Sequence, residues 1–319
     1  MEKNIYSLIL DADLNEDFVE SFKIRNIDQK FLYLDEWAEL YYEEKKTDFL
    51  YDYYGVNKKI LNHLKIEDYF TSKKNLYVSL CCWKSYIEEV IFNRLLDKDI
   101  KFEYYGVDSS RSMISMSVDT LRNMKLKQKY ILADFFSRDF RNEILRLSKP
   151  YGSRLYSIFN NTFGNLNQTR VVNNLNNILR VWDKIWIDVR MRDGLSVSDN
   201  LELFNKYCSS LESESRQRFF DNVFSKFGIP KENYSYYIST RNDDVLWALV
   251  FDFIAKFSKK TKFSMYGNEI IILPNEDVKI THIYTYDSKR LISFFREHGF
   301  KIIKKYVTKS RGHFIFEKV

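Results

Sequence analysis

Residues 101–138, KFEYYGVDSSRSMISMSVDTLRNMKLKQKYILADFFSR, decide the fold class of this chain. The aromatic and β-branched run Phe102–Val107 is typical of a buried strand and is followed by Asp108. A helix is expected next, because apolar residues then recur at roughly helical spacing. A second strand, Lys129–Ala133, ends in Asp134. Two consecutive strands therefore each place an acidic residue at the carboxyl end, the edge at which open α/β sheets bind ligands.

These two acids form a candidate nucleoside site. Asp108 can accept hydrogen bonds from both hydroxyls of a ribose, and the pair Asp134-Phe135 can hold an adenine at its exocyclic amine and its face. Each acid alone would more often cap the end of its strand, and Ser109 and Ser110 are good N-cap residues for the next helix. The spacing of the two acids favours nucleoside binding over capping alone.

The alternation of strands and helices continues on both sides of this stretch. Further strands are expected at Asn75–Leu80, Arg154–Phe159 and Lys184–Val189, and helices at Tyr86–Leu96 and Thr169–Leu179. Such a series predicts a doubly wound α/β sheet. The first turn, which runs through Cys81, Cys82 and Trp83, contains no glycine, although glycines there would let the backbone approach a cofactor. The bulk of Trp83 would obstruct that approach.

A polar segment, Asn160-Asn161-Thr162-Phe163-Gly164-Asn165, follows the strand that ends at Phe159. Side-chain amides offer both donors and acceptors, so this segment could hold an amine or a carboxylate. An ordinary Asn/Gly turn is the alternative interpretation.

Composition excludes several classes of protein. The 319 residues, 45% hydrophobic and 17% aromatic, can form one large α/β domain with an insertion or two modest domains. The net charge of +6 is spread without a dense basic tract, and residues 1–50 carry 13 acidic against 6 basic side chains. No nucleic-acid partner is therefore expected.

Cysteine and histidine usage indicates neither a disulfide framework nor a zinc site. Cys81, Cys82 and Cys208 are odd in number, which fits a reducing compartment, and the four histidines lie far apart. Neither a targeting signal nor an apolar span of about 18 residues is visible, so a cytoplasmic protein with no membrane partner is expected.

The first 70 residues are acidic and aromatic and are expected to form a mostly helical cap. Within them, Tyr51, Tyr53 and Tyr54 cluster just before Gly55. Such a cluster could cover a small aromatic or cationic ligand, although packing between domains is the more common use.

Three segments, YYGVDSSRSMI, KYILADFF and LYSIFNNTFGNLN, resemble class I S-adenosylmethionine-dependent methyltransferases. Their order is similar to that in the histidine N-alpha-methyltransferase family of ergothioneine biosynthesis. The resemblance covers roughly residues 75–319 and implies a Rossmann-like sheet with an inserted α+β substrate lobe and an N-terminal helical cap. The implied domains are a cap at 1–70, a core at 71–194 and 271–319, and a lobe at 195–270.

The resemblance also implies roles for single residues. Cofactor binding falls on Ser79, Cys81, Lys84, Asp108, Ser109, Asp134, Phe135 and Asn160; catalysis on Asn161, Thr162 and Asn165; and substrate binding on Tyr54, Asn165, Thr281 and Ile283. Thr281 and Ile283 stand where the family has an acid and a serine that contact the imidazole, which puts histidine itself in doubt as the substrate. No metal site is implied.

The remainder of the chain is expected to follow the same family pattern. Helices are expected in the lobe at Leu201–Tyr207, Ser215–Phe227 and Val245–Phe257. Nearer the C-terminus, YDSKRLISFFREHGF matches a helix that Asp287 caps and Gly299 ends.

The expected function is transfer of a methyl group from S-adenosylmethionine to the nitrogen of a small amino acid or amine, with S-adenosylhomocysteine as product, as in small-molecule biosynthesis. A sulfonium methyl is already activated, so the protein chiefly has to align the nucleophile and exclude water. Two alternatives stay open: an enzyme of the same fold that modifies a peptide or an oxygen, and a degenerate fold used only for binding. The sequence does not predict the oligomeric state.

Overall fold

The computed structural model describes residues 5–33, 38, 58–193 and 197–319. The chain forms two compact units. Unit 1 comprises Met1–Ile9, Asp52–Asp193 and Tyr286–Val319, and unit 2 comprises Leu10–Tyr51 and Gly194–Thr285. The expected cap at 1–70 is thus divided between the two units, and Tyr51, Tyr53 and Tyr54 lie outside the described residues.

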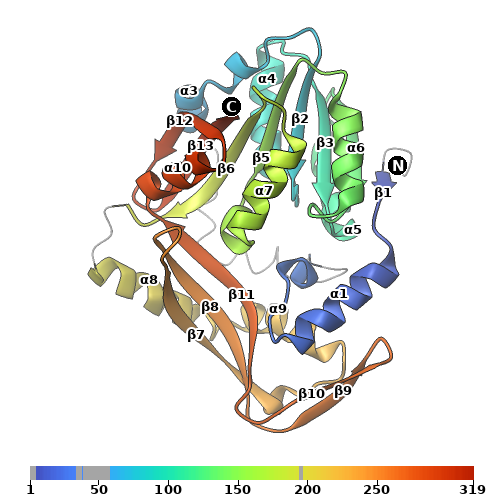
Figure 1. Ribbon diagram of the computed structural model, residues 1–319, viewed down its shortest axis with the longest axis vertical. Coiled ribbons are helices and arrows are strands. Elements are labelled where there is room, and N and C mark those ends of the chain that lie inside the picture. Colours follow the sequence, from blue (N-terminus) through green and yellow to red (C-terminus); the bar gives the residue numbers. More distant parts are fainter. Residues whose placement is uncertain (1–4, 34–37, 39–57, 194–196) are drawn as a thin grey trace. The chain divides into compact units, whose positions relative to one another are not determined.

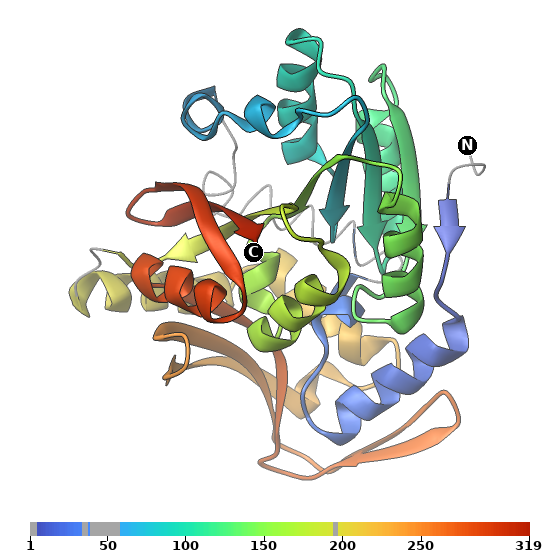
Figure 2. The same ribbon diagram turned by 45° about the horizontal axis from the view of Figure 1, so that its top comes forward.

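Unit 1 is built on a sheet with the strand order β1-β4-β3-β2-β5-β6-β13-β12 (Figure 1). The parallel strands are β1 (Ile5–Ser7), β2 (Asn75–Leu80), β3 (Glu103–Asp108), β4 (Lys127–Leu132), β5 (Ser153–Ile158) and β6 (Lys184–Met191). An antiparallel hairpin of β12 (Phe300–Val307) and β13 (Arg311–Lys318) joins β6 through β13 (Figure 2, red). The predicted α/β sheet is confirmed.

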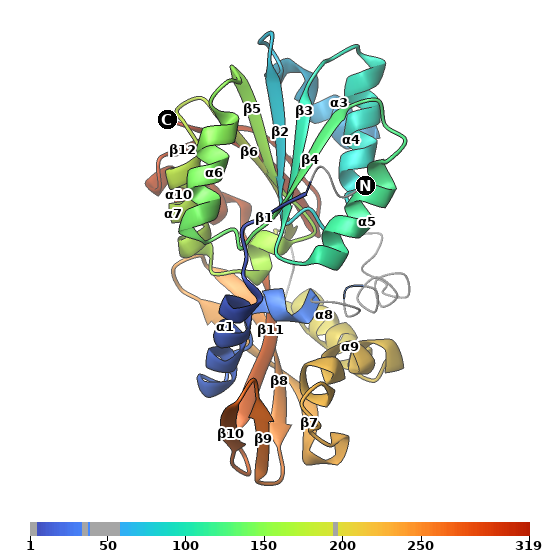
Figure 3. The same ribbon diagram turned by 90° about the vertical axis from the view of Figure 1, so that its right-hand side faces the viewer.

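Helices cover both faces of this sheet (Figure 3). One face carries α4 (Tyr86–Asp97) and α5 (Arg111–Leu121), with α3 (Lys58–Leu64) and the short helix η4 (Ile66–Tyr69) in the same apolar core. The other face carries α6 (Arg138–Ser148), α7 (Gln168–Ile178) and α10 (Ser288–Glu297). Because both faces are covered, the central strand β2 is buried along its whole length, although its sequence includes Asn75 and Ser79.

The ends of α10 confirm the expected caps. The Asp287 carboxylate accepts a hydrogen bond of 2.9 Å from the Arg290 N–H, and Gly299 adopts φ +81° just after the helix. By contrast, strand β1 was not predicted. It has only three residues, and it is a strand because it pairs with β4, a segment more than 100 residues away in the sequence.

Unit 2 is an α+β unit. It contains α1 (Asp11–Lys23), α8 (Val197–Ser210), α9 (Glu214–Ser225) and the short helices η2 (Gln29–Tyr33) and η6 (Lys231–Asn233). Strands β7 (Tyr234–Asp243), β8 (Ala248–Phe257) and β11 (Asp277–Tyr286) form an antiparallel sheet, and β9 (Thr261–Met265) pairs with β10 (Asn268–Ile272). The helices expected at Leu201–Tyr207 and Ser215–Phe227 are confirmed by α8 and α9.

The helix expected at Val245–Phe257 is wrong, because the segment from Ala248 onward is strand β8. It pairs with β7 on one side and with β11 on the other. Its alternate residues Phe251, Phe253 and Phe257 contact rings of α8 and α9, with Tyr207–Phe251 centroids 4.8 Å apart. A short apolar run fits both the helical and the strand spacing of apolar residues. Here, pairing with a strand on each side stabilises the strand.

Candidate functional site

The carboxyl ends of β2, β3, β4 and β5 lie at one edge of the unit 1 sheet, because these strands are parallel neighbours (Figure 1). The loops that leave this edge contain most of the predicted site residues. They are residues 81–85 after β2, 109–110 after β3, 133–137 after β4 and 159–165 after β5.

The turn after β2 has the backbone of a glycine-rich loop although it contains no glycine. Cys81, Trp83 and Ser85 adopt φ values of +60°, +44° and +55°, the left-handed region that side chains disfavour. The indole of Trp83 is buried and packs edge-to-face against Tyr86, with ring centroids 5.1 Å apart. The predicted cofactor residues Cys81 and Lys84 are half-buried in this turn.

Asp108 ties this turn to the end of β3. One carboxylate oxygen accepts the Trp83 N–H at 3.1 Å, and the other accepts the Ser110 N–H at 3.0 Å. Burial raises the pKa of Asp108 to about 6, although these N–H donors act to lower it. A carboxylate has about four acceptor positions, so Asp108 can hold the turn and still accept hydroxyl groups. Ser109 beside it is half-buried, and Ser110 caps α5.

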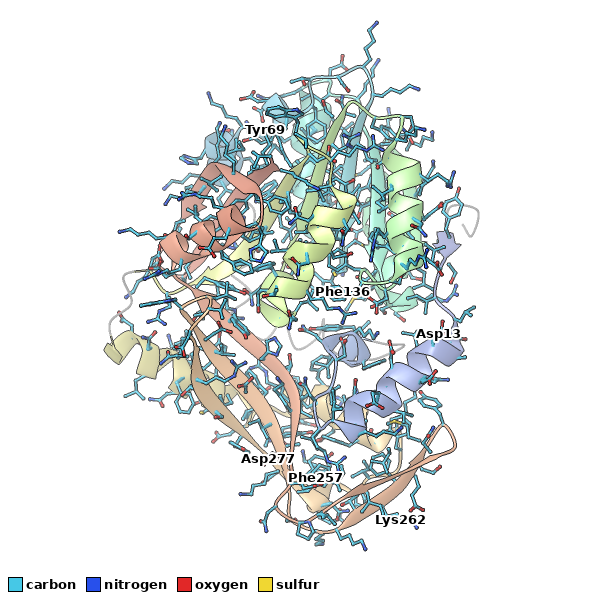
Figure 4. All side chains as sticks on the ribbon, in the orientation of Figure 1. Asp13, Tyr69, Phe136, Phe257, Lys262 and Asp277 are labelled. Atoms are coloured by element: carbon cyan, nitrogen blue, oxygen red, sulfur yellow. The ribbon has the colours of Figure 1, made fainter. Side chains whose placement is uncertain are left out.

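The acid and the two aromatic residues after β4 differ in how far their side chains are buried. Asp134 accepts the Phe136 N–H at 2.7 Å and is half-buried. The ring of Phe135 is buried and lies 6.1 Å from that of Phe140. Phe136 (Figure 4) was not among the predicted site residues and is half-buried. The Arg170 guanidinium lies 4.1 Å from its ring centroid. Of the two phenylalanines in ADFF, Phe136 is thus the more accessible.

Asn160 and Asn161 open the loop after β5 in the left-handed conformation, with φ values of +60° and +57°. The Asn160 side-chain oxygen accepts a hydrogen bond of 3.2 Å from the Tyr86 hydroxyl, which links this loop to the start of α4. Thr162 and Asn165 are half-buried in the short helix η5 (Thr162–Asn165).

Asn161 is buried and holds the loop against β6. Its N–H donates to Asp188 at 3.2 Å, and its side-chain oxygen accepts the Arg190 N–H at 2.9 Å. Its side-chain amide donates to the Asn165 side-chain oxygen at 3.2 Å. In the described structure, Asn161 therefore orients Asn165, which has the more accessible amide of the two.

A buried carboxyl group, that of Glu88, lies next to the end of β2 and was not among the predicted site residues. The buried Ser79 hydroxyl donates to the Glu88 carboxylate at 2.5 Å. Burial raises the pKa of Glu88 to about 7. Glu88 looks like a surface residue in the first turn of a helix, but it precedes the buried Ile91 and Leu95 by three and seven positions. That position on the apolar stripe is the signal that could have found it.

Two predicted substrate residues belong to the other unit. Thr281 and Ile283 lie on β11 opposite Phe253 and Phe251, so their side chains share the sheet face on which α8 and α9 pack. Of the other two predicted substrate residues, Asn165 lies in the loop after β5, and Tyr54 lies outside the described residues. The structure brings together the predicted residues of the β2, β3 and β5 loops within unit 1.

The described residues contain no group of three or more histidine, cysteine or acidic side chains that could hold a metal ion. Across the same ranges, no helix combines the length and apolar character needed to cross a bilayer.

No protein-family model and no curated protein matches this sequence. Solved structures are similar to it at low identity. An S-adenosylmethionine-dependent methyltransferase from Clostridium acetobutylicum is 12% identical, with 82% of this chain and 92% of that chain covered and a TM-score of 0.43. The CcbJ methyltransferase from Streptomyces caelestis is 11% identical, with 81% and 93% covered and a TM-score of 0.43.

A third similar structure is the 1,6-didemethyltoxoflavin-N1-methyltransferase of Burkholderia thailandensis, with bound 1,6-didemethyltoxoflavin and S-adenosylhomocysteine. It is 8% identical, with 97% of this chain and 88% of that chain covered and a TM-score of 0.39. Similarity at this level assigns no activity to the present chain.

Proposed function

We propose that this chain is an S-adenosylmethionine-dependent methyltransferase that methylates the nitrogen of a small amino acid or amine. The observation that carries the proposal is the contact between Asp108 and the turn after β2. A half-buried carboxylate at the end of β3 receives the N–H of Trp83 from a turn with left-handed residues at positions 81, 83 and 85. This backbone is the one that glycines usually supply where a chain approaches a nucleotide closely.

The residues at this edge fit the cofactor. Asp108 would accept the ribose hydroxyls, and Asp134 with Phe135 or the more accessible Phe136 would hold the adenine. Cys81, Lys84, Ser109 and Asn160, which are half-buried, would line the remainder of the cofactor site. Ser79 is buried and donates to Glu88, so it would support this edge from below rather than contact the cofactor. When bound, S-adenosylmethionine supplies a methyl group that is already activated by the positive sulfur.

The loop after β5 would hold the acceptor. An amine must be neutral to attack. The side chain of Asn165, which Asn161 holds in place, offers both a donor and an acceptor that can orient the amine and thereby its lone pair. Thr162 adds a half-buried hydroxyl to the same loop. A small-molecule acceptor is favoured over nucleic acid, because the sequence has no dense basic tract.

The first test is titration calorimetry of the full chain with S-adenosylmethionine and S-adenosylhomocysteine. Both should bind, and Asp108→Asn should weaken each by about 10-fold or more, because a charge-assisted hydrogen bond is lost and the amide NH2 faces one of the two backbone N–H groups that Asp108 accepts. The control is Asp119→Asn, which changes an exposed carboxylate on α5. Failure of the wild type to bind either compound would favour the non-catalytic alternative, and unchanged affinity in Asp108→Asn would refute the ribose assignment.

The acceptor is then tested with methyl-labelled S-adenosylmethionine and a panel of amino acids and amines, each paired with its N-acetyl derivative. A nitrogen acceptor predicts labelled product from the free amine and none from its acetylated partner. Equal labelling of the free amine and its N-acetyl derivative would indicate that an oxygen, not the nitrogen, is methylated. Labelling of peptides alone would favour the peptide-modifying alternative.

A further inference from the structure

The antiparallel sheet of unit 2 has one face that α8 and α9 cover and one that carries a polar cluster. Phe251 and Phe253 of β8 point to the helices. Asp252, the residue between them, points the other way and lies opposite His282 of β11 and Ser239 of β7 on the second face. The same registers place Arg241, Lys279 and Tyr284 on this face. We call Arg241, Asp252, Lys279 and Tyr284 the Asp252 patch.

Asp252 has one carboxylate oxygen in use and one without a partner. The Arg241 Nε–H donates to Oδ2 at 2.7 Å. The other oxygen, Oδ1, is shielded from solvent and accepts no hydrogen bond, and the whole residue is only 7% exposed. A buried carboxylate oxygen is costly to leave without a donor, so its position indicates that a donor belongs there.

Two cationic side chains, Arg241 and Lys279, lie near the Asp252 carboxylate on this face. The Arg241 side chain is 44% exposed, so part of its guanidinium faces outward, and it also donates to the Tyr284 hydroxyl at 3.4 Å. Tyr284 in turn donates to Asp243 at 3.1 Å, which fixes its hydroxyl. Burial lowers the pKa of Lys279, Asp252 acts to raise it, and Arg241 acts to lower it. The patch therefore combines an acceptor that lacks a donor with two cations that can bind an anion.

We propose that the Asp252 patch binds the zwitterion of a small amino acid. The ligand ammonium donates to Asp252 Oδ1, and the ligand carboxylate accepts from the outward N–H groups of Arg241 and from Lys279. A guanidinium and a carboxylate match in shape and charge, and an ammonium beside a buried carboxylate restores its missing hydrogen bond. The site lies within unit 2 and uses no residue of the proposed cofactor site, so the inference goes beyond the proposed function.

The test is titration of the full chain, without cofactor, with each of the common amino acids. At least one amino acid should bind, and its N-acetyl derivative should bind at least 10-fold more weakly, because it lacks the ammonium. Asp252→Asn should weaken binding by at least 10-fold while keeping the shape of the side chain. The matched control, Asp277→Asn, removes an exposed carboxylate from the same face of β11 and should bind like the wild type.

Lys279→Met distinguishes this proposal from an alternative in which Lys279 and Asp252 pair with each other and bind no ligand. Weaker amino-acid binding in Lys279→Met supports a ligand carboxylate at Lys279, and it does so even where Asp252→Asn fails to fold. Tighter binding would show that Lys279 itself closes on Asp252, and would overturn the proposal. So would the absence of binding by every amino acid, or equal binding by the N-acetyl derivative.

The outcome is independent of the proposed function. S-adenosylmethionine affinity measured on the same samples should be equal in the wild type and in Asp252→Asn. Amino-acid binding without cofactor binding would refute the methyltransferase proposal alone. Cofactor binding without amino-acid binding would refute this inference alone.

Discussion

Glu88 makes the stability of unit 1 depend on pH. Its carboxyl group is buried next to Ser79, and burial raises its pKa from 4.5 to about 7. The folded state thus favours the protonated form. Its contribution to stability is complete below about pH 4.5, declines as the pH rises, and is lost above about pH 7.

Glu88→Gln should remove this dependence, because the amide oxygen can still accept the Ser79 hydrogen bond without acquiring a charge. From about pH 5 to about pH 8, the free energy of unfolding of the wild type should fall relative to that of the variant by about 3 kcal/mol, from about 1.4 kcal/mol per pKa unit. Urea unfolding at several pH values measures this difference. Glu89→Gln, at the half-buried neighbouring position, is the control and should follow the wild type. Parallel pH profiles for the wild type and Glu88→Gln would show that the carboxyl group is not buried as described.

At the scale of the element, the turn after β2 combines a strained backbone with side-chain packing that can offset the strain. Cys81 and Trp83 both occupy the left-handed region, which costs a non-glycine residue about 1–2 kcal/mol. The two residues differ in how much packing the side chain contributes. Trp83 is 7% exposed and packs on Tyr86, whereas Cys81 is half-buried.

Cys81→Gly should therefore be neutral or stabilise the protein by about 0.5 kcal/mol, because relief of strain slightly exceeds the added freedom of the unfolded chain. Trp83→Gly should destabilise it by about 3–5 kcal/mol, since the loss of a large buried side chain outweighs the same relief. Chemical denaturation of both variants measures the two effects. A loss of more than about 1 kcal/mol in Cys81→Gly would mean that the thiol contributes packing that its exposure does not reveal.

At the scale of the whole molecule, each unit has its own core, and unit 2 is assembled from segments that are distant in sequence. Phe18 and Phe22 of α1 pack against Phe227, which follows α9, with ring centroids 5.6 and 6.2 Å apart. Arg25 also pairs with Glu276 at 2.8 Å. Residues near the N-terminus thus complete the unit that is inserted between β6 and α10.

Phe253→Ala should destabilise unit 2 by about 3–5 kcal/mol, because a buried ring that contacts Tyr207 and Phe220 is removed. Hydrogen exchange followed by mass spectrometry should show faster exchange in peptides of α8, α9 and α1, with peptides of β2 and β5 unchanged. Leu155→Ala, in the core of unit 1, should give the reverse pattern. Loss of protection in both units from either substitution would show that they unfold as one.

Local patterns in the sequence were enough to predict the elements that carry the proposed cofactor site. Strand β3 with Asp108, strand β4 with Asp134 after it, and helix α4 lie within two residues of their expected bounds. Apolar runs, helical spacing and caps act between residues that are close in the chain, so they can be read without the fold.

Tertiary structure alone decided the rest, because the partners come from distant segments. Strand β1 is a strand because it pairs with β4, and β8 is a strand because it pairs with β7 and β11. The same holds for the contacts of Asp108 with Trp83, Ser79 with Glu88, and Arg241 with Asp252. Side-chain chemistry names the possible donors and acceptors, and the fold selects which of them meet.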